Sequence, residues 1–341
     1  MEKKDRLQSR CTKKIRRTIS AAKLLIVVFP IVVVSAVPGF AGTSDSNSTS
    51  AHVKPTPDYK NTKFTGDWGG QRTKLAEKGV TLDIYTVQSY QGVLDGGRDS
   101  QWKYGGYNSF LLKLDFQKMG LWPGAFMEIG AEDQFGEFIN GKTGAMIPAN
   151  TDGVLPEPGK HDVYLDRVVF KQFFSDQFGL FLGKVTTLTE SGGDWNLFAS
   201  GRGDTQFMNM AFVINPVTLQ TAPYSTLGGG LIFLFPSLSP SPSEHSTLVM
   251  SVIGPDGLPG EWPWHDYSSG TAYNAEFKLP TRFFKKPGGQ FFGATYSTKD
   301  FAATDQDPRL ILADLIRGLP PTLQKHEGSS CFYYNFISVP L

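Results

Sequence analysis

The chain has 341 residues, a formal net charge of +1, 13% aromatic and 19% charged residues, and 37 glycines. Length alone suggests two domains, although barrels of this size are often one unit. The low charged fraction and the many Gly, Phe and Tyr residues favour a chain of short strands joined by Gly-rich turns.

The N-terminal segment has the pattern of a signal peptide. Residues 1–23 contain nine Lys/Arg, Leu24 to Val37 form an apolar run, and Gly39 and Ala41 are the small residues of a cleavage site after Ala41. The apolar run is too short to span a bilayer. We therefore predict that residues 1–41 are a signal peptide. Its removal leaves 24 basic and 30 acidic residues, a net charge of −6, so no nucleic-acid partner is expected.

The remaining chain offers neither a disulfide nor a membrane-spanning helix. Cys11 leaves with the signal peptide and Cys331 is then alone. No apolar stretch of about 20 residues follows residue 41. These features predict an exported protein that is periplasmic, secreted or an outer-membrane barrel.

Two short segments precede the predicted strands. Residues 42–63 are polar and rich in Ser, Thr and Pro, and we interpret them as a flexible linker. Asp67 can cap a helix over about 68–78 that Gly79 would end. This helix is short and mostly polar, so we expect it to pack against another element such as a barrel rim.

From residue 80 onward the pattern changes to alternation of polar and apolar residues. Around 109–116 one face is apolar, whereas the other carries Ser109, Lys113 and Asp115 with Leu111 as its apolar exception. The next strand puts Glu128, Glu132 and Gln134 on one face. We predict strands at 80–93, 105–118, 124–137, 161–174, 177–186, 205–214, 226–236, 245–254, 270–279, 289–298 and 331–338. Alternation of this kind suits either a soluble sandwich or a membrane barrel.

The connections and aromatic residues favour the barrel. Short connections such as 119–123 alternate with long ones such as 138–160 and 255–269, as in outer-membrane barrels. Aromatic residues gather at the strand ends, which is typical of a barrel's aromatic girdle, although the edges of a sandwich core would look similar. The aromatic residues concerned are Trp122, Phe173, Phe174, Phe178, Trp262, Trp264, Phe283 and Phe284.

Several segments between residues 64 and 300 resemble the carbohydrate-selective porin family of the OprB type. The most specific are GDWGGQRTKLAEKGV and the GLWPG turn; looser matches are DVYLDRVVFKQFF, GLFLGKVT, QFMNMAFVINP and APYSTLGGGLIF. The resemblance implies an all-β fold, a sixteen-stranded antiparallel transmembrane β-barrel spanning residues 64–341 here, in the outer membrane of a Gram-negative-type bacterium. It also implies passive diffusion of sugars, with outer-membrane lipid and the barrel-assembly machinery as partners.

The resemblance further implies that polar strand residues line the pore. The expected lining residues are Lys113, Asp115, Glu128, Glu132, Asp166, Arg167, Lys184 and Glu276. Asp166 and Arg167 are neighbours in one predicted strand, so alternation allows only one of them to face the lumen. Their charged groups could exchange hydrogen bonds with sugar hydroxyls, although any one of them could simply be a wet-face residue.

The chain departs from the family pattern at its C-terminus. About eleven strands are predicted where the resemblance implies sixteen, and an odd number does not close the usual bacterial barrel. The last residues are Pro340 and Leu341, whereas outer-membrane strands typically end on an aromatic residue. We therefore expect a barrel that is incomplete at the C-terminus.

No motif indicates catalysis, a cofactor or a metal. The five histidines have no metal-ligand spacing, and neither a nucleophile elbow nor a phosphate-binding loop is present. We predict that the protein is not an enzyme and needs no cofactor. Two alternatives to the sugar channel stay open: a porin for phosphate or other small anions, and a secreted all-β glycan-binding protein or enzyme.

Overall fold

A computed structural model describes residues 63–156, 162–188, 207–213, 221–238, 245–283, 286–303, 309, 314, 316 and 323–338. The predicted signal peptide (1–41) and the linker up to residue 62 lie outside these residues. Among the described residues, no helix has the length and apolar composition needed to cross a membrane.

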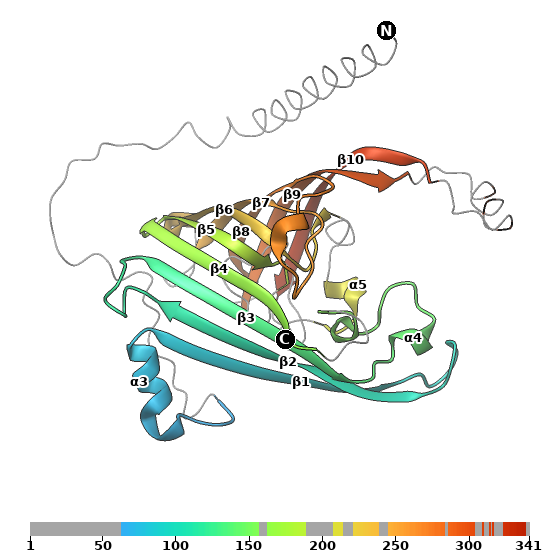
Figure 1. Cartoon of the computed structure of the whole chain (residues 1–341), viewed down its shortest axis with the longest axis horizontal. Coiled ribbons are helices and arrows are strands. Elements are labelled where there is room, and N and C mark those ends of the chain that lie inside the picture. The colour runs from blue at the N-terminus through green and yellow to red at the C-terminus, as the bar shows by residue number, and fades with distance from the viewer. Residues whose placement is uncertain are drawn as a thin grey trace, which may run out of the picture. The chain divides into compact units, whose positions relative to one another are not determined.

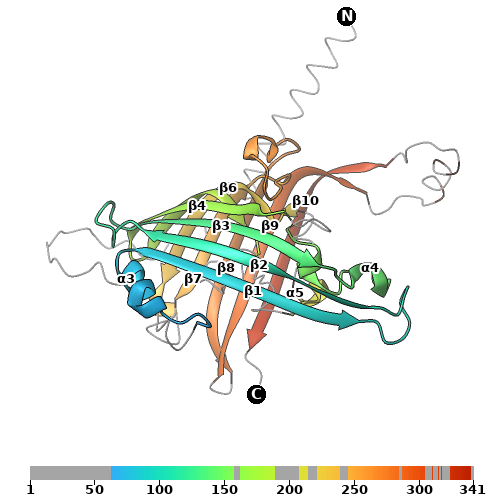
Figure 2. The same ribbon diagram turned by 60° about the horizontal axis from the view of Figure 1, so that its bottom comes forward.

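The described strands form one antiparallel sheet in which each strand pairs with its neighbours in sequence. Ten strands follow one another in the order β1 to β10, and the sheet curves along this order (Figures 1 and 2). β1 and β10 stand at the two ends of this order and do not pair with each other. The strands are β1 (Val80–Gly92), β2 (Trp102–Asp115), β3 (Ala125–Gly136), β4 (Tyr164–Ser175), β5 (Phe178–Thr186), β6 (Ser225–Phe235), β7 (Ser246–Ile253), β8 (Ala272–Phe283), β9 (Lys286–Ala302) and β10 (Lys325–Ser338).

Short helices lie outside the sheet. They are η1 (Trp68–Gly70), α3 (Gln71–Glu77), α4 (Asn140–Thr143), η2 (Thr151–Gly153), α5 (Met210–Val213), η4 (Pro236–Leu238) and η5 (Pro263–His265). The prediction of an all-β antiparallel fold with a short N-terminal helix is confirmed.

The N-terminal helix differs in detail from the single helix predicted over 68–78. Gly69 and Gly70 have positive φ angles of 65° and 88°, which interrupt the helix and divide it into η1 and α3. Asp67 still binds the first turn of α3, because its Oδ1 accepts the Thr73 backbone N–H at 2.8 Å. Gly79, at φ 87°, separates α3 from β1.

The predicted strand at 205–214 is wrong where the structure describes it, since residues 210–213 form the helix α5. The Asn209 side chain explains this start, because its Oδ1 accepts the backbone N–H of Ala211 at 2.9 Å, as an N-terminal cap does. The other ten predicted strands correspond to β1–β10. β8, β9 and β10 extend beyond their predicted ends.

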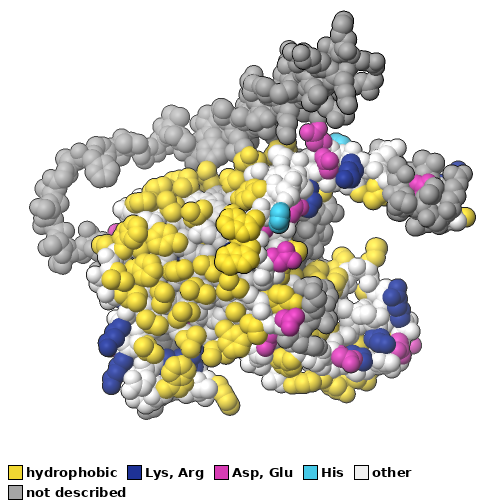
Figure 3. Space-filling view, viewed as in Figure 1, with side chains coloured by type: hydrophobic (Ala, Val, Ile, Leu, Met, Phe, Trp, Pro, Cys, Tyr) yellow, Lys and Arg dark blue, Asp and Glu magenta, His cyan; other side chains and the backbone are white. Residues whose placement is uncertain are grey.

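Directly paired residues of neighbouring strands share a face, so the register divides the sheet into two faces. The convex face carries large exposed apolar side chains and is largely hydrophobic in Figure 3. Its members include Ile84, Phe110, Leu165, Leu182, Val252, Phe292 and Phe332. The concave face carries the charged residues of β1–β4 except Asp133, which the register places on the convex face opposite Asn108. Over β4–β8 it carries a buried apolar cluster that includes Val169, Phe181, Ile232 and Val249.

The connections alternate between the two ends of the sheet. One end has α3 and the turns 116–124 and 176–177, and the other end has the connections 93–101, 137–163, 187–224 and 254–271. Aromatic side chains of the convex face pair near both ends. Tyr90 stacks on Trp102 with centroids 5.1 Å apart, and Phe178 contacts both Phe174 and Phe233.

Candidate functional site

A row of alternating charges crosses the concave face from β1 to β4. Asp83 accepts from Lys63 Nζ at 3.0 Å and from Lys113 Nζ at 3.4 Å. Lys113 is paired directly opposite Glu128, and Glu128 accepts a short hydrogen bond from Lys171. We call Lys63, Asp83, Lys113, Glu128 and Lys171 the charge row.

The strand register explains how these groups meet. Odd positions of β1 pair with odd positions of β2, these pair with even positions of β3, and these in turn pair with odd positions of β4. All four strands therefore present these side chains to the same side. Lys171 is almost fully buried, with 4% of its side chain exposed, whereas Lys113 keeps 36%. A buried ammonium is stable only with a close carboxylate, which Glu128 supplies.

Asp166 and Arg167 continue the polar surface where β4 departs from regular pairing. Gly130 is opposite Arg167 and Ala131 is opposite Leu165, so Asp166 is an extra residue in a β-bulge. Both side chains are buried, and Arg167 Nε donates to Asp166 Oδ2 at 2.8 Å. This differs from the expectation that only one of the two could face inward, because a bulge breaks the alternation.

Glu132 and Gln134 lie further along β3 and hold segments from the long connections. The Tyr224 hydroxyl donates to Glu132 Oε2 at 2.6 Å. Gln134 Nε2 donates to the backbone carbonyls of Asp152 and Leu155. Glu132 is fully buried as a result, and η2 is fixed against the concave face.

Asn150 ties the same segment to β1. Its Nδ2 donates to Ser89 Oγ at 3.0 Å and to Gln91 Oε1 at 2.8 Å, both on the concave face of β1. The next residue, Thr151, donates through its backbone N–H and its hydroxyl to the carbonyl of Met208, at 2.7 and 2.8 Å. Residues 148–155 and 208–210 therefore form one hydrogen-bonded unit on the concave side, which we call the inner segment.

The remaining predicted residues have other surroundings. Asp115 lies on the concave face at the end of β2, where its Oδ1 accepts the Lys118 N–H at 3.0 Å and closes the turn. Glu276 lies on the concave face of β8 and accepts a short hydrogen bond from the Tyr333 hydroxyl. Both are thus bound to neighbouring protein groups.

Lys184 differs from its expected place. The register puts it on the convex face of β5 with Leu180 and Leu182, opposite Phe181. Its Nζ donates to the carbonyls of Leu258 and Glu261 at 2.6 and 2.7 Å. The sequence shows only that Lys184 follows an apolar run, and it does not give the strand register that decides which face the side chain occupies.

Sequence reasoning missed Lys63, Asp83, Lys171, Asn150 and Tyr224. Asp83 and Lys171 carried a usable signal, because each is a charged residue within an apolar alternating strand, in TLDIY and FKQFF. Asn150 and Tyr224 lie in irregular connections, where no period indicates direction. Among the described residues, no group of three or more His, Cys, Asp or Glu could hold a metal ion.

Comparison with known proteins gives a match only at the level of structure. No protein-family model and no curated protein matches the chain. The high-pH structure of Pseudomonas putida OprB matches with a TM-score of 0.58 and 19% identity, over 79% of this chain and 64% of that one. The low-pH structure of the same protein matches at a TM-score of 0.38 and 14% identity, over 72% of this chain and 67% of that one. The chain thus spans about two thirds of the first OprB chain, and its described part has the antiparallel β fold of the OprB porin.

Proposed function

We propose that this chain forms the wall of an outer-membrane channel through which small saccharides diffuse passively. The observation that carries the proposal is the contrast between the two faces of one sheet. The convex face exposes large apolar side chains, as a lipid-facing surface does, and the concave face carries the charge row and the inner segment. The match to the OprB fold supports the same reading.

The pairing of charges favours a neutral solute. Lys63, Lys113 and Lys171 each have a carboxylate partner in the charge row, and Arg167 has Asp166. Such a wall offers donors and acceptors to hydroxyl groups without a large excess of either sign. An anion-selective wall would need basic groups in excess, so we favour saccharides over phosphate and other small anions.

The inner segment supplies the narrowing that a selective channel needs. It is held to β1 by Asn150 and to β3 by Gln134, and both bonds lie on the concave side. We propose that it narrows the passage near Glu132 and Gln134, at the end of β3 away from the turn 116–124. Of the expected lining residues we retain Glu132, Asp166 and Arg167 near this narrowing, and Lys113, Glu128, Asp115 and Glu276 as wall residues elsewhere. Lys184 is left out because it lies on the other face.

Liposome swelling in saccharides of increasing size tests the proposal. We expect vesicles that contain the full chain to swell in small neutral sugars and to exclude larger ones. Lys113→Ala should change the swelling rate, because Lys113 has the most exposed side chain of the charge row. Thr86→Ala, on the convex face of β1, is the matched control and should not.

The outcomes separate the alternatives. Swelling that is the same with and without the protein would reject a channel. A strong preference for anions in planar bilayers would support the phosphate-type porin instead. A water-soluble protein that binds glycans at a saturable site would support the secreted glycan-binding alternative. We further propose that the chain resides in the outer membrane of a Gram-negative-type bacterium, inserted by the barrel-assembly machinery.

A further inference from the structure

The connection between β7 and β8, residues 254–271, crosses the ends of three neighbouring strands. Asp266 Oδ2 accepts the backbone N–H of Leu227 in β6 at 2.5 Å. Lys184 in β5 donates to the carbonyls of Leu258 and Glu261. The N–H of Gly260 donates to the carbonyl of Leu165 in β4 at 3.0 Å. We call this connection the lateral loop.

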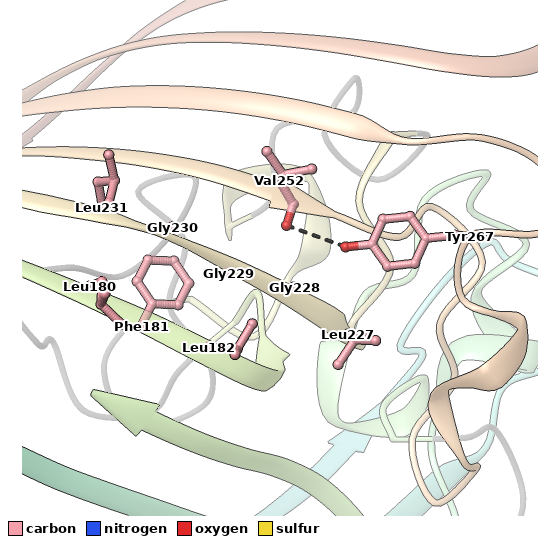
Figure 4. Close-up of a pocket in the computed structure, with 10 residues that line it drawn as sticks. All are labelled: Leu180, Phe181, Leu182, Leu227, Gly228, Gly229, Gly230, Leu231, Val252 and Tyr267. Carbon is pink, nitrogen blue, oxygen red and sulfur yellow. Dashed lines mark hydrogen bonds between the residues drawn. The ribbon is translucent and has the colours of Figure 1, made fainter. Parts of the chain in front are cut away.

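The lateral loop lies on the convex side of these strands. Lys184 and Leu227 are directly paired and belong to the convex face. Tyr267 lies over a shallow apolar depression whose convex-face lining includes Leu180, Leu182, Leu231 and Val252 (Figure 4). The Tyr267 hydroxyl donates to the Val252 carbonyl at 3.4 Å, as the dashed line in Figure 4 shows. Tyr267 therefore lies on the convex side, whereas the base of the loop also binds the concave-face residue Thr226, whose hydroxyl donates to the Gly254 carbonyl at 2.8 Å.

Hydrogen bonds within the lateral loop fix its conformation. The Asp256 carboxylate accepts from Lys299 Nζ at 2.7 Å and from the backbone N–H and the hydroxyl of Ser269, each at 2.7 Å. The Asp256 N–H donates to the Asp266 carbonyl at 3.0 Å. These bonds close the loop at its base, and the bonds from Lys184 to the Leu258 and Glu261 carbonyls hold its middle part.

That middle part presents two tryptophans. Trp262 and Trp264 are 78% and 81% exposed, and their rings are nearly parallel, with an interplanar angle of 12° and centroids 6.5 Å apart. Leu258 of the same loop is 52% exposed. An indole has a large apolar surface and one N–H donor, so it is most stable at a boundary where its ring contacts an apolar phase and its N–H reaches water.

We propose that the lateral loop binds the lipid surface, with Trp262 and Trp264 at the boundary between acyl chains and headgroups, and that Lys184 positions it there. This rests on the proposed outer-membrane location. The middle of the loop lies on the convex side of the sheet, so β4–β6 stand between it and the concave face along which a solute would pass. The alternative is that the two exposed rings stack on a saccharide, which would require them to face the passage.

Tryptophan quenching in vesicles tests this proposal. The full chain is inserted into phosphatidylcholine vesicles whose acyl chains carry bromine, which quenches indoles that contact the chains. The difference between the wild type and Trp262→Phe/Trp264→Phe reports the pair alone. Trp68→Phe, in η1 at the opposite end of the sheet, is the control. We expect the pair to lose most of its emission to bromine and to be shielded from iodide in the water.

A second variant tests the role of Lys184. Lys184→Met removes the two bonds to the loop carbonyls and keeps the length of the side chain, so bromine quenching of the pair should fall while the other tryptophans stay unchanged. Unchanged quenching in this variant overturns the role given to Lys184.

The remaining outcomes overturn the lipid contact. If iodide quenches the pair and bromine does not, while bromine quenches the other tryptophans, the lateral loop lies in water and the outer-membrane location still holds. If bromine quenches none of the tryptophans, both proposals fail. If added saccharide changes the emission of the pair, and bromine does not, the pair binds sugar and the lipid contact is rejected.

Discussion

Removal of Lys171 should destabilise the sheet strongly, because it leaves Glu128 without its closest cation. Lys171→Met keeps the length and most of the apolar volume of the side chain but removes the ammonium group. Only 4% of the Lys171 side chain is exposed, and 24% of the Glu128 side chain. Water can therefore replace little of the lost interaction at Glu128.

The size of the effect follows from this burial. Loss of one partner of a buried ion pair costs about 3–5 kcal/mol, whereas an exposed pair contributes about 0–1 kcal/mol. Glu128 is partly exposed and still faces Lys113 across the strand pair, which places the expected loss near the lower limit, at about 3 kcal/mol. Lys113→Met breaks the more exposed pair with Asp83 and should cost about 1 kcal/mol or less.

Urea unfolding of the vesicle-bound chain, followed by tryptophan emission, measures both losses. The double variant Glu128→Gln/Lys171→Met should recover a large part of the lost stability, because no buried charge is then left alone. Equal losses for Lys171→Met and Lys113→Met would refute the reasoning from burial. Additive losses in the double variant would refute the pairing of Glu128 with Lys171.

Three further predictions concern packing, the inner segment and the lateral loop. Gly230→Ala should lower the unfolding free energy by about 1–3 kcal/mol in the urea assay, because its Cβ would lie 2.1 Å from the Met250 carbonyl oxygen and 2.7 Å from the Phe181 ring. Gly229→Ala is the control and should cost less, because the nearest atoms to its Cβ lie at 3.0 Å. Tyr224→Phe removes the hydroxyl that donates to buried Glu132, so it should cost about 1–3 kcal/mol and speed hydrogen exchange around residues 221–224; unchanged exchange would contradict the contact. Burial opposes the ionised form of Asp256, but its bonds with Lys299 and Ser269 outweigh this and hold its pKa below the ordinary value of 3.8. Its contribution is therefore present above pH 3.8 and lost as the pH falls through the lower folded value, so hydrogen exchange in the lateral loop should rise there in the wild type but not in Asp256→Asn.

Strand alternation predicted most of the sheet because side-chain direction depends only on local backbone geometry. The polar positions Ser109, Lys113 and Asp115 share a face with Leu111, the apolar exception in the sequence. The structure accounts for that exception. Leu111 is paired opposite Gly130, and a Cβ on Gly130 would lie 2.7 Å from both Arg167 Nε and Asp166 Oδ1. Leu111 therefore lies opposite a glycine, and the side chains of Asp166 and Arg167 fill the space beside that glycine.

The expectation for Asp166 and Arg167 failed for a reason that a single sequence hides. A β-bulge is defined by two strands, because it is the pairing of Gly130 and Ala131 that skips Asp166. The sequence of β4 alone reads as regular alternation. Lys184 is a related case, since its face depends on its pairing with Leu227 and not on the apolar run before it.

The parts of the site that could not be predicted are held by bonds from side chains to distant backbone. Gln134 binds the carbonyls of Asp152 and Leu155, and Lys184 binds those of Leu258 and Glu261. Every residue has a carbonyl group, so these contacts leave no mark on the residue type of the segment that is bound. The same kind of bond holds the inner segment on the concave face and the lateral loop on the convex face. Two irregular segments are thus directed to opposite sides of one sheet, and the face of the strand residue that holds each one decides the side on which it lies.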